Sequence, residues 1–279
     1  MTENRIEFRK KREIGDIFTD SFHFLKLERK PLVRLLGIYA FPFIILYGVV
    51  QVYFQKNLLT NIDLSDMENM MANLGPMYLN IMLFSLFGLF VQALVIATYY
   101  SYIEAYVKKG KGNFELADIT PQLFNNGLLA IGASLAVFVM VIFGLILCVV
   151  PGIYFANTLS PAIIILLFER KGIAAALTRS AFIENRQWWN TFLLNIVGLI
   201  VVWAASFVFS IPGMVAGFTV SITQQATTPL NYPDWYWVLS GISTIVSSVF
   251  YIVPYTFIAF QYFNLDEITK DSAQPEIKS

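Results

Sequence analysis

Long charge-free windows alternate with short charged segments along the chain, and the windows predict its elements. A helix that crosses the hydrocarbon core of a bilayer needs about 20 mostly apolar residues. The windows around residues 35–55, 77–103 and 235–263 meet that requirement. The pattern therefore predicts an all-α fold, an integral membrane helical bundle.

One charge-free window, residues 121–168, is too long for a single span. Its 48 residues would form a helix of about 72 Å, more than twice the thickness of the hydrocarbon core. Because adjacent proline and glycine interrupt helices, we predict a turn at Val150-Pro151-Gly152, and a bend near Pro254 in the last span. The six predicted spans cover about residues 35–55, 77–103, 125–149, 152–168, 191–212 and 235–263.

Each pair of predicted spans follows a segment in which apolar residues recur at helical spacing. These segments are residues 13–27, 114–124 and 172–189. In the first segment one helical face carries Ile14, Ile17, Phe18, Phe22 and Leu25. Amphipathic helices of this kind lie at the head-group level with the apolar side down. We therefore predict an internal repeat of three helical hairpins, each preceded by an interfacial helix.

Composition supports a membrane location and excludes several classes of function. Hydrophobic residues make up 57% of the chain and charged residues 14%, against about 25% charged in a soluble domain. The formal net charge of zero gives no bulk basicity for nucleic acid. Cys148 and His23 are the single residues of their types, so we expect no metal site, no cofactor and no enzymatic activity.

The basic residues predict the orientation in the membrane. If both termini and residues 104–124 and 169–188 share one side, that side holds 18 of the 19 lysines and arginines, and only Lys56 lies opposite. Cytoplasmic loops carry the excess of basic residues. We expect both termini in the cytoplasm and outer loops that are acidic or neutral, with Asp63, Asp66, Glu68 and Asp234 as their acidic residues.

Three regions follow from this topology: a basic and amphipathic N-terminal segment (residues 1–30), a six-span domain (31–265) and a polar tail (266–279). The first region lacks the continuous apolar stretch of a secretory signal peptide. Nine lysines and arginines within residues 1–34 would attract anionic lipid head groups. Alternatively, they serve only to fix the topology.

The region from 151 to 192 carries a recognisable series of short motifs. The series is Pro151-Gly-Ile-Tyr154, Ser160-Pro161, Glu169-Arg-Lys-Gly172, Ala175-Ala-Leu-Thr-Arg179-Ser180 and Asn185-Arg-Gln-Trp188-Trp189. Together with Arg12-Glu-Ile-Gly-Asp16 and Tyr262-Phe-Asn-Leu265, it resembles an uncharacterised family of prokaryotic six-span membrane proteins named after the membrane domain of glycerophosphoryl diester phosphodiesterase. The resemblance implies this fold in the cytoplasmic membrane of a prokaryote. It implies no phosphodiesterase activity, because a separate soluble barrel with histidines performs that reaction.

Neutral polar residues inside the predicted spans are the candidate site. They are Gln92, Asn157, Asn195 and Gln261. They would line a polar route for a solute, or else form interhelical hydrogen bonds, which typically contribute about 0.6–2 kcal/mol. Glu104, at the inner end of the second span, is the nearest candidate for a buried acid, and a structural role at the membrane edge is favoured over a functional one.

Tryptophans flank the last two predicted spans and are typical interfacial anchors. They are Trp188, Trp189, Trp235 and Trp237. Two functions stay open. The first is a non-enzymatic protein that interacts with membrane lipids or partner membrane proteins. The second is a transporter or channel-like component for a neutral or amphiphilic solute. The sequence does not indicate an oligomeric state.

Overall fold

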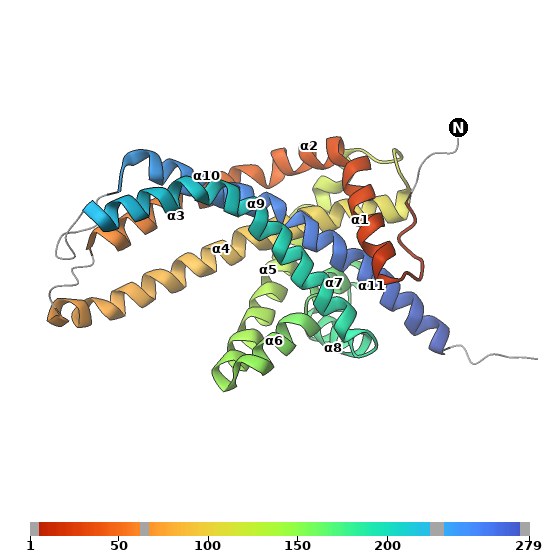
Figure 1. Ribbon diagram of the computed structural model, residues 1–279. Helices are drawn as coiled ribbons and strands as arrows, with labels where there is room; N and C mark the ends of the chain where they lie inside the picture. The colour runs from red at the N-terminus through yellow and green to blue at the C-terminus, as the bar shows by residue number, and fades with distance from the viewer. Residues whose placement is uncertain (1–5, 62–66, 224–231, 274–279) are drawn as a thin grey trace, which may run out of the picture. The chain divides into compact units, whose positions relative to one another are not determined.

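The computed structural model describes residues 6–61, 67–223 and 232–273, and every regular element in these ranges is an α-helix (Figure 1). The helices are α1 (Ile14–Leu27), α2 (Arg29–Tyr39), α3 (Phe41–Asn61), α4 (Met67–Lys109), α5 (Leu116–Leu147), α6 (Val149–Thr158), α7 (Ala162–Glu169), α8 (Ile173–Glu184), α9 (Trp188–Thr223), α10 (Asp234–Phe250) and α11 (Ile252–Ala273). The predicted all-α fold is therefore confirmed.

Within the described residues, five helical segments are long and apolar enough to cross a membrane. They are Leu74–Lys109, Leu116–Leu147, Val149–Glu169, Trp188–Thr219 and Asp234–Ser272. A sixth is obtained if α2 and α3 together form one broken span. These are the helices of a multi-pass membrane protein. The arrangement in three hairpins and the orientation stay predictions, and Asp63 and Asp66 of the predicted outer loop lie outside the described residues.

The long charge-free window breaks at Cys148, slightly before the predicted turn. Cys148 has extended backbone angles, φ −175° and ψ 160°, between the end of α5 at Leu147 and the start of α6. A proline ring clashes with the carbonyl group four residues earlier in a helix, which here is that of Leu147. Pro151 thus ends the preceding helix and itself lies in the first turn of the next one.

The same relation holds at Pro254. Helix α10 ends at Phe250, four residues before this proline, and α11 begins at Ile252. The helix is therefore interrupted about one helical turn before the proline, within one candidate span, Asp234–Ser272.

The chain forms two compact units. Unit 1 contains Met1–Ala40, Ala93–Ile200 and Ile252–Ser279, and unit 2 contains Phe41–Gln92 and Val201–Tyr251. Helices α4 and α9 each contribute one end to each unit.

Unit 1 has an aromatic core into which the segment before α1 inserts. Phe8 is buried, stacks on Phe260 with ring centroids 4.4 Å apart, and meets Phe24 edge-on at 5.1 Å. The backbone N–H of Ile6 donates to the Tyr106 hydroxyl at 3.1 Å. The N-terminal segment is therefore part of the core of unit 1.

Two of the three predicted interfacial segments are separate helices. Residues 13–27 correspond to α1 and residues 172–189 contain α8, whereas residues 114–124 run without a break into α5. Helices α1 and α5 begin in the same way, since Asp16 accepts from the N–H of Glu13 at 3.4 Å and Asp118 from the N–H of Glu115 at 3.1 Å. This shared start supports a relationship between the first two segments and does not extend to α8.

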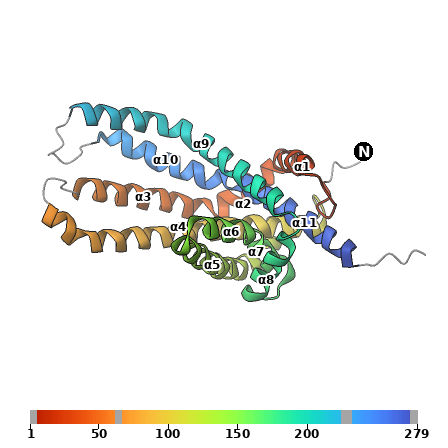
Figure 2. The same cartoon turned by 60° about the horizontal axis from the view of Figure 1, so that its bottom comes forward.

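In unit 2, α3 packs along α10 in both views (Figures 1 and 2). Glycines permit the close approach. A Cβ atom on Gly241 would lie 2.9 Å from Val52 Cγ2, and one on Gly48 would lie 3.2 Å from the Gly241 carbonyl oxygen. The residues just beyond this contact, toward the C-terminal end of α3, form the cavity of the next section.

Candidate functional site

Polar side chains follow one stripe on each of three apolar helices in unit 2. Gln51 and Gln55 on α3 are four residues apart, as are Ser206 and Ser210 on α9. On α10 the stripe contains Tyr236, Ser240, Ser243 and Ser247. Residues three or four apart share a helical face, so each helix presents its polar groups in one direction.

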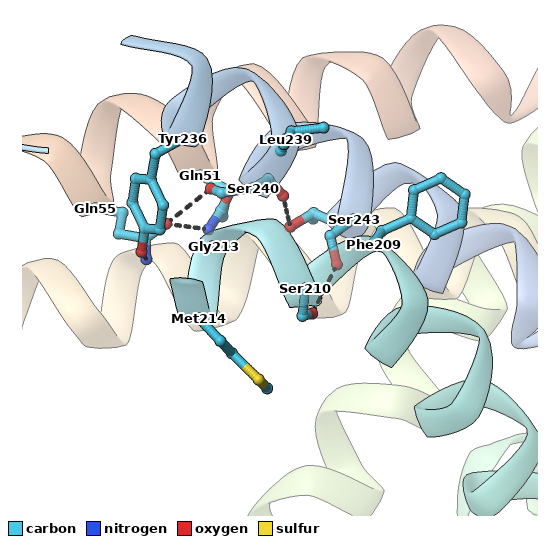
Figure 3. A pocket seen from close by; sticks show the side chains of 11 residues that line it. Gln51, Gln55, Phe209, Ser210, Gly213, Met214, Tyr236, Leu239, Ser240 and Ser243 are labelled. Carbon is cyan, nitrogen blue, oxygen red and sulfur yellow. Dashed lines mark hydrogen bonds between the residues drawn. The ribbon is translucent and has the colours of Figure 1, made fainter. Parts of the chain in front are cut away.

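The side chain of Gln55 is the centre of a hydrogen-bonded group. Its Oε1 accepts from Gln51 Nε2 at 2.8 Å and from the Ser240 hydroxyl at 2.9 Å. Its Nε2 donates to the Tyr236 hydroxyl at 3.2 Å. Figure 3 shows these four side chains together, with Ser210 and Ser243 beside them. The group joins α3 to α10 through uncharged donors and acceptors.

The serines of α9 and α10 are bonded unevenly. Ser206 and Ser247 share a hydrogen bond of 2.6 Å between their hydroxyl oxygens. One turn further along, Ser210 and Ser243 are 3.5 Å apart, at the outer limit for such a bond. The Ser210 hydroxyl donates its proton to the Ser206 carbonyl oxygen at 2.9 Å, so Ser210 keeps acceptor capacity for another molecule.

A cavity of about 340 Å³ lies where the weaker serine pair and the glutamines meet. Its lining comprises Gln51, Gln55, Phe209, Ser210, Gly213, Met214, Tyr236, Leu239, Ser240, Ser243 and Thr244 (Figure 3). This volume falls at the lower end of the about 300–1,000 Å³ typical of small-molecule sites. Gly213 leaves room for the Tyr236 ring, because a Cβ atom there would lie 3.2 Å from its Cε2.

The chemistry of the cavity is set by the absence of charge among its described lining residues. Amide, hydroxyl and phenol groups offer both donors and acceptors, and Phe209, Met214 and Leu239 supply apolar contact. An ion would lose its hydration there without gaining a counter-charge, which is costly. The arrangement can bind an uncharged molecule with several hydroxyl or amide groups.

The structure places the four sequence-predicted polar residues elsewhere. Asn195 Nδ2 donates to Asn157 Oδ1 at 2.8 Å and to the Ser160 hydroxyl at 3.2 Å. Gln261 Nε2 donates to the Thr191 hydroxyl at 3.0 Å. These three residues belong to unit 1 and join helices there.

Gln92 lies on α4 in unit 2 and is not among the lining residues of the cavity.

The four tryptophans differ in their surroundings. The Trp188 indole N–H donates to the Thr158 hydroxyl at 3.0 Å, and its ring stacks on Tyr154. Trp237 is buried, whereas Trp189 and Trp235 are exposed. Trp189 and Trp235 therefore fit the predicted interfacial role, whereas Trp188 and Trp237 also contact residues inside the protein.

Glu104 is a buried acid with two basic partners in unit 1. Its carboxylate lies 2.7 Å from both Lys108 Nζ and Arg170 Nη2. Arg170 adopts a left-handed backbone (φ 56°) at the end of α7, and its other terminal nitrogen donates to Asn126 Oδ1 at 2.5 Å. This satisfied ion pair supports the structural role that the sequence favours.

Glu184, at the end of α8, is a buried acid that the sequence did not single out. Its side chain is fully buried, and neither carboxyl oxygen has a partner of normal hydrogen-bond geometry among the described residues. Burial raises its pKa to about 8, although the Thr191 hydroxyl is close enough to lower the pKa in part. We therefore expect the carboxyl group to be protonated at neutral pH.

Single polar residues within the spans do not indicate the lining of the cavity, which is formed by three helices. The signal available in the sequence was the repetition of polar residues at spacings of three and four within charge-free helices. Comparison with protein-family models, curated proteins and solved structures finds no match for this chain.

Proposed function

We propose that this chain is a non-enzymatic multi-pass membrane protein whose unit 2 binds an uncharged, hydroxyl- or amide-bearing solute, as a component of a transport process. The cavity of about 340 Å³ carries the proposal. Glutamine, serine, threonine and tyrosine side chains around a space between apolar helices are best satisfied when a polar molecule occupies that space. The glutamines, Ser240 and Tyr236 already bond to one another, but the pair Ser210 and Ser243 stays 3.5 Å apart, whereas Ser206 and Ser247 one turn away close to 2.6 Å.

The position of the cavity along the helices supports access from one membrane face. Gln55 is six residues before the end of α3, and Tyr236 is the third residue of α10. At 1.5 Å per residue, Gln55 is about 9 Å and Gln51 about 15 Å from the helix end, so both lie toward the C-terminal end of α3. With the termini in the cytoplasm, this face is the outer one.

Uncharged solutes fit better than ions or charged metabolites. The lining of described residues lacks lysine, arginine, histidine, aspartate and glutamate, so it lacks the usual groups for ion or proton coupling. Small polyols and monosaccharides present the matching density of hydroxyl groups. The apolar side chains would contact the carbon skeleton of such a solute.

The proposal is tested by the thermal stability of the purified full-length protein with matched pairs of solutes. Glycerol, myo-inositol and glucose are compared with glycerol 3-phosphate, inositol phosphate and glucose 6-phosphate at equal concentrations and ionic strength. At least one uncharged member should raise the melting temperature in a saturable manner, because a ligand that binds only the folded state stabilises it. Equal responses to both members of every pair, or no saturable response, would refute the proposed site.

A further inference from the structure

Seven of the nine basic residues within residues 1–34 fall into two groups with different surroundings. The first group is paired with acidic residues of unit 1. Arg12 has a side chain only 1% exposed, donates to Asp20 Oδ2 at 2.8 Å, and lies over the Phe260 ring at 4.8 Å. Arg9 lies 3.3 Å from Asp266, and Lys11 pairs with Asp271. The charges of this group are balanced within the protein.

The second group is exposed and has no ion-pair partner within the described parts of the chain. It consists of Lys26, Arg29, Lys30 and Arg34, here called the basic face. These residues occupy the end of α1 and the first half of α2.

The nearest acid in the sequence does not balance this face. Glu28 stands between Lys26 and Arg29 in the chain, yet it is buried. Its Oε2 accepts from the Tyr102 hydroxyl at 2.6 Å, and its Oε1 lies 4.0 Å from Lys111 Nζ. Glu28 is the only acidic residue among residues 26–34 and is directed inward, which leaves the basic face with its full positive charge.

Apolar side chains border the basic face. On α2 the buried side consists of Leu32, Leu35 and Leu36. The opposite side carries Lys30 and Arg34, with Val33 (71% exposed) and Ile38 (53% exposed) on either side of them. Residues 35–55 then contain no charge. The order along the chain is that of a membrane interface, with cations first and apolar residues after them.

We propose that the basic face docks on the phosphate groups of anionic phospholipids, with Val33 and Ile38 among the acyl chains. An acidic protein would complement the charge equally well. The exposed apolar residues and the charge-free stretch that follows favour a lipid. This inference is independent of the proposed solute site, because it concerns unit 1 alone.

The test compares two double variants of the full-length protein that each remove one lysine and one arginine. Lys30→Gln/Arg34→Gln alters the basic face, and Arg9→Gln/Lys11→Gln alters the internally paired group. Each protein is placed in nanodiscs with equal amounts of phosphatidylglycerol and phosphatidylcholine, and native mass spectrometry gives the ratio of the two lipids retained. Each basic residue near an anionic surface contributes about fivefold to binding.

The wild type and Arg9→Gln/Lys11→Gln should retain phosphatidylglycerol preferentially, and Lys30→Gln/Arg34→Gln should reduce the ratio by about tenfold or more. An unchanged ratio in Lys30→Gln/Arg34→Gln, or an equal fall in both variants, would overturn the proposal. Should the variant not fold, the salt dependence of the wild type decides the question. Raising NaCl from 50 to 500 mM should abolish the preference, and a preference insensitive to salt would contradict it.

Discussion

Units 1 and 2 both place polar groups among apolar helices, but they satisfy them differently. In unit 1 ion pairs and hydrogen bonds join buried polar groups, such as Glu104 with Arg170 and Asn157 with Asn195, and the carboxyl group of Glu184 is an exception. In unit 2 the polar groups are uncharged, and those of α3 and α10 bond to one another while they also line a cavity of about 340 Å³. The difference indicates that polar residues in membrane helices both connect helices and form a site where their contacts leave a space.

The largest effect is expected from removing the buried charge of Arg12 in unit 1. Arg12→Met leaves Asp20 unpaired and the Phe8 carbonyl without its donor at 2.8 Å. Breaking one partner of such a pair typically costs about 3–5 kcal/mol. The melting temperature in detergent should fall sharply, whereas Lys10→Met, at an exposed position in the same segment, should change stability by less than about 0.5 kcal/mol. Similar small effects for both would show that the segment is not part of the core.

The pH dependence of stability should depend on Glu184. Since its pKa in the folded protein is about 8 and the unfolded value is 4.5, the folded state binds the proton more tightly. The contribution of Glu184 to stability should be fully present below about pH 4.5 and be lost as the pH rises toward about 8. Glu184→Gln should remove this slope in melting curves recorded from pH 5 to 8. An unchanged slope in Glu184→Gln would assign the dependence to other groups.

In unit 2, Gly241→Ala tests whether the contact between α3 and α10 forms the cavity. The new Cβ atom would lie 2.9 Å from Val52 Cγ2, and overpacking of this kind costs about 1–3 kcal/mol. Gly37→Ala is the matched control, because its Cβ atom has nothing within 4 Å and alanine favours a helix. Stability should fall in the first variant and hold or rise in the second. Equal behaviour would contradict the close approach.

The smallest effect is expected for the interhelical hydrogen bonds of unit 1. Asn157→Leu and Asn195→Leu should each lower stability by about 0.6–2 kcal/mol. In the double variant the losses should be less than additive, because both substitutions remove the same bond of 2.8 Å. Strict additivity in the double-mutant cycle would instead favour the prediction that these residues line a polar route for a solute.

The sequence predicted the helical membrane fold because charge-free windows and helix length are local properties. It located both proline breaks to within one turn. The observed breaks come before the prolines because a proline ring clashes with the carbonyl group four residues earlier in a helix. It could not divide the basic N-terminal residues into two groups, since Asp266 and Asp271 lie more than 250 residues further along the chain. The cavity likewise depends on three helices meeting, which no single polar residue indicates.

The most direct test of the proposed solute site compares two double variants that each replace two serines by alanine. Ser240→Ala/Ser243→Ala removes two hydroxyl groups from the cavity, and Ser206→Ala/Ser247→Ala removes two from the bonded pair outside its lining. The Kd of the solute that stabilises the wild type is measured by isothermal titration calorimetry on all three proteins. We expect Kd to rise about tenfold or more in the first variant, since each lost hydrogen bond contributes about 0.5–1.5 kcal/mol, and to change little in the second. An unchanged Kd in Ser240→Ala/Ser243→Ala, or the same increase in both variants, would contradict a binding site at this cavity.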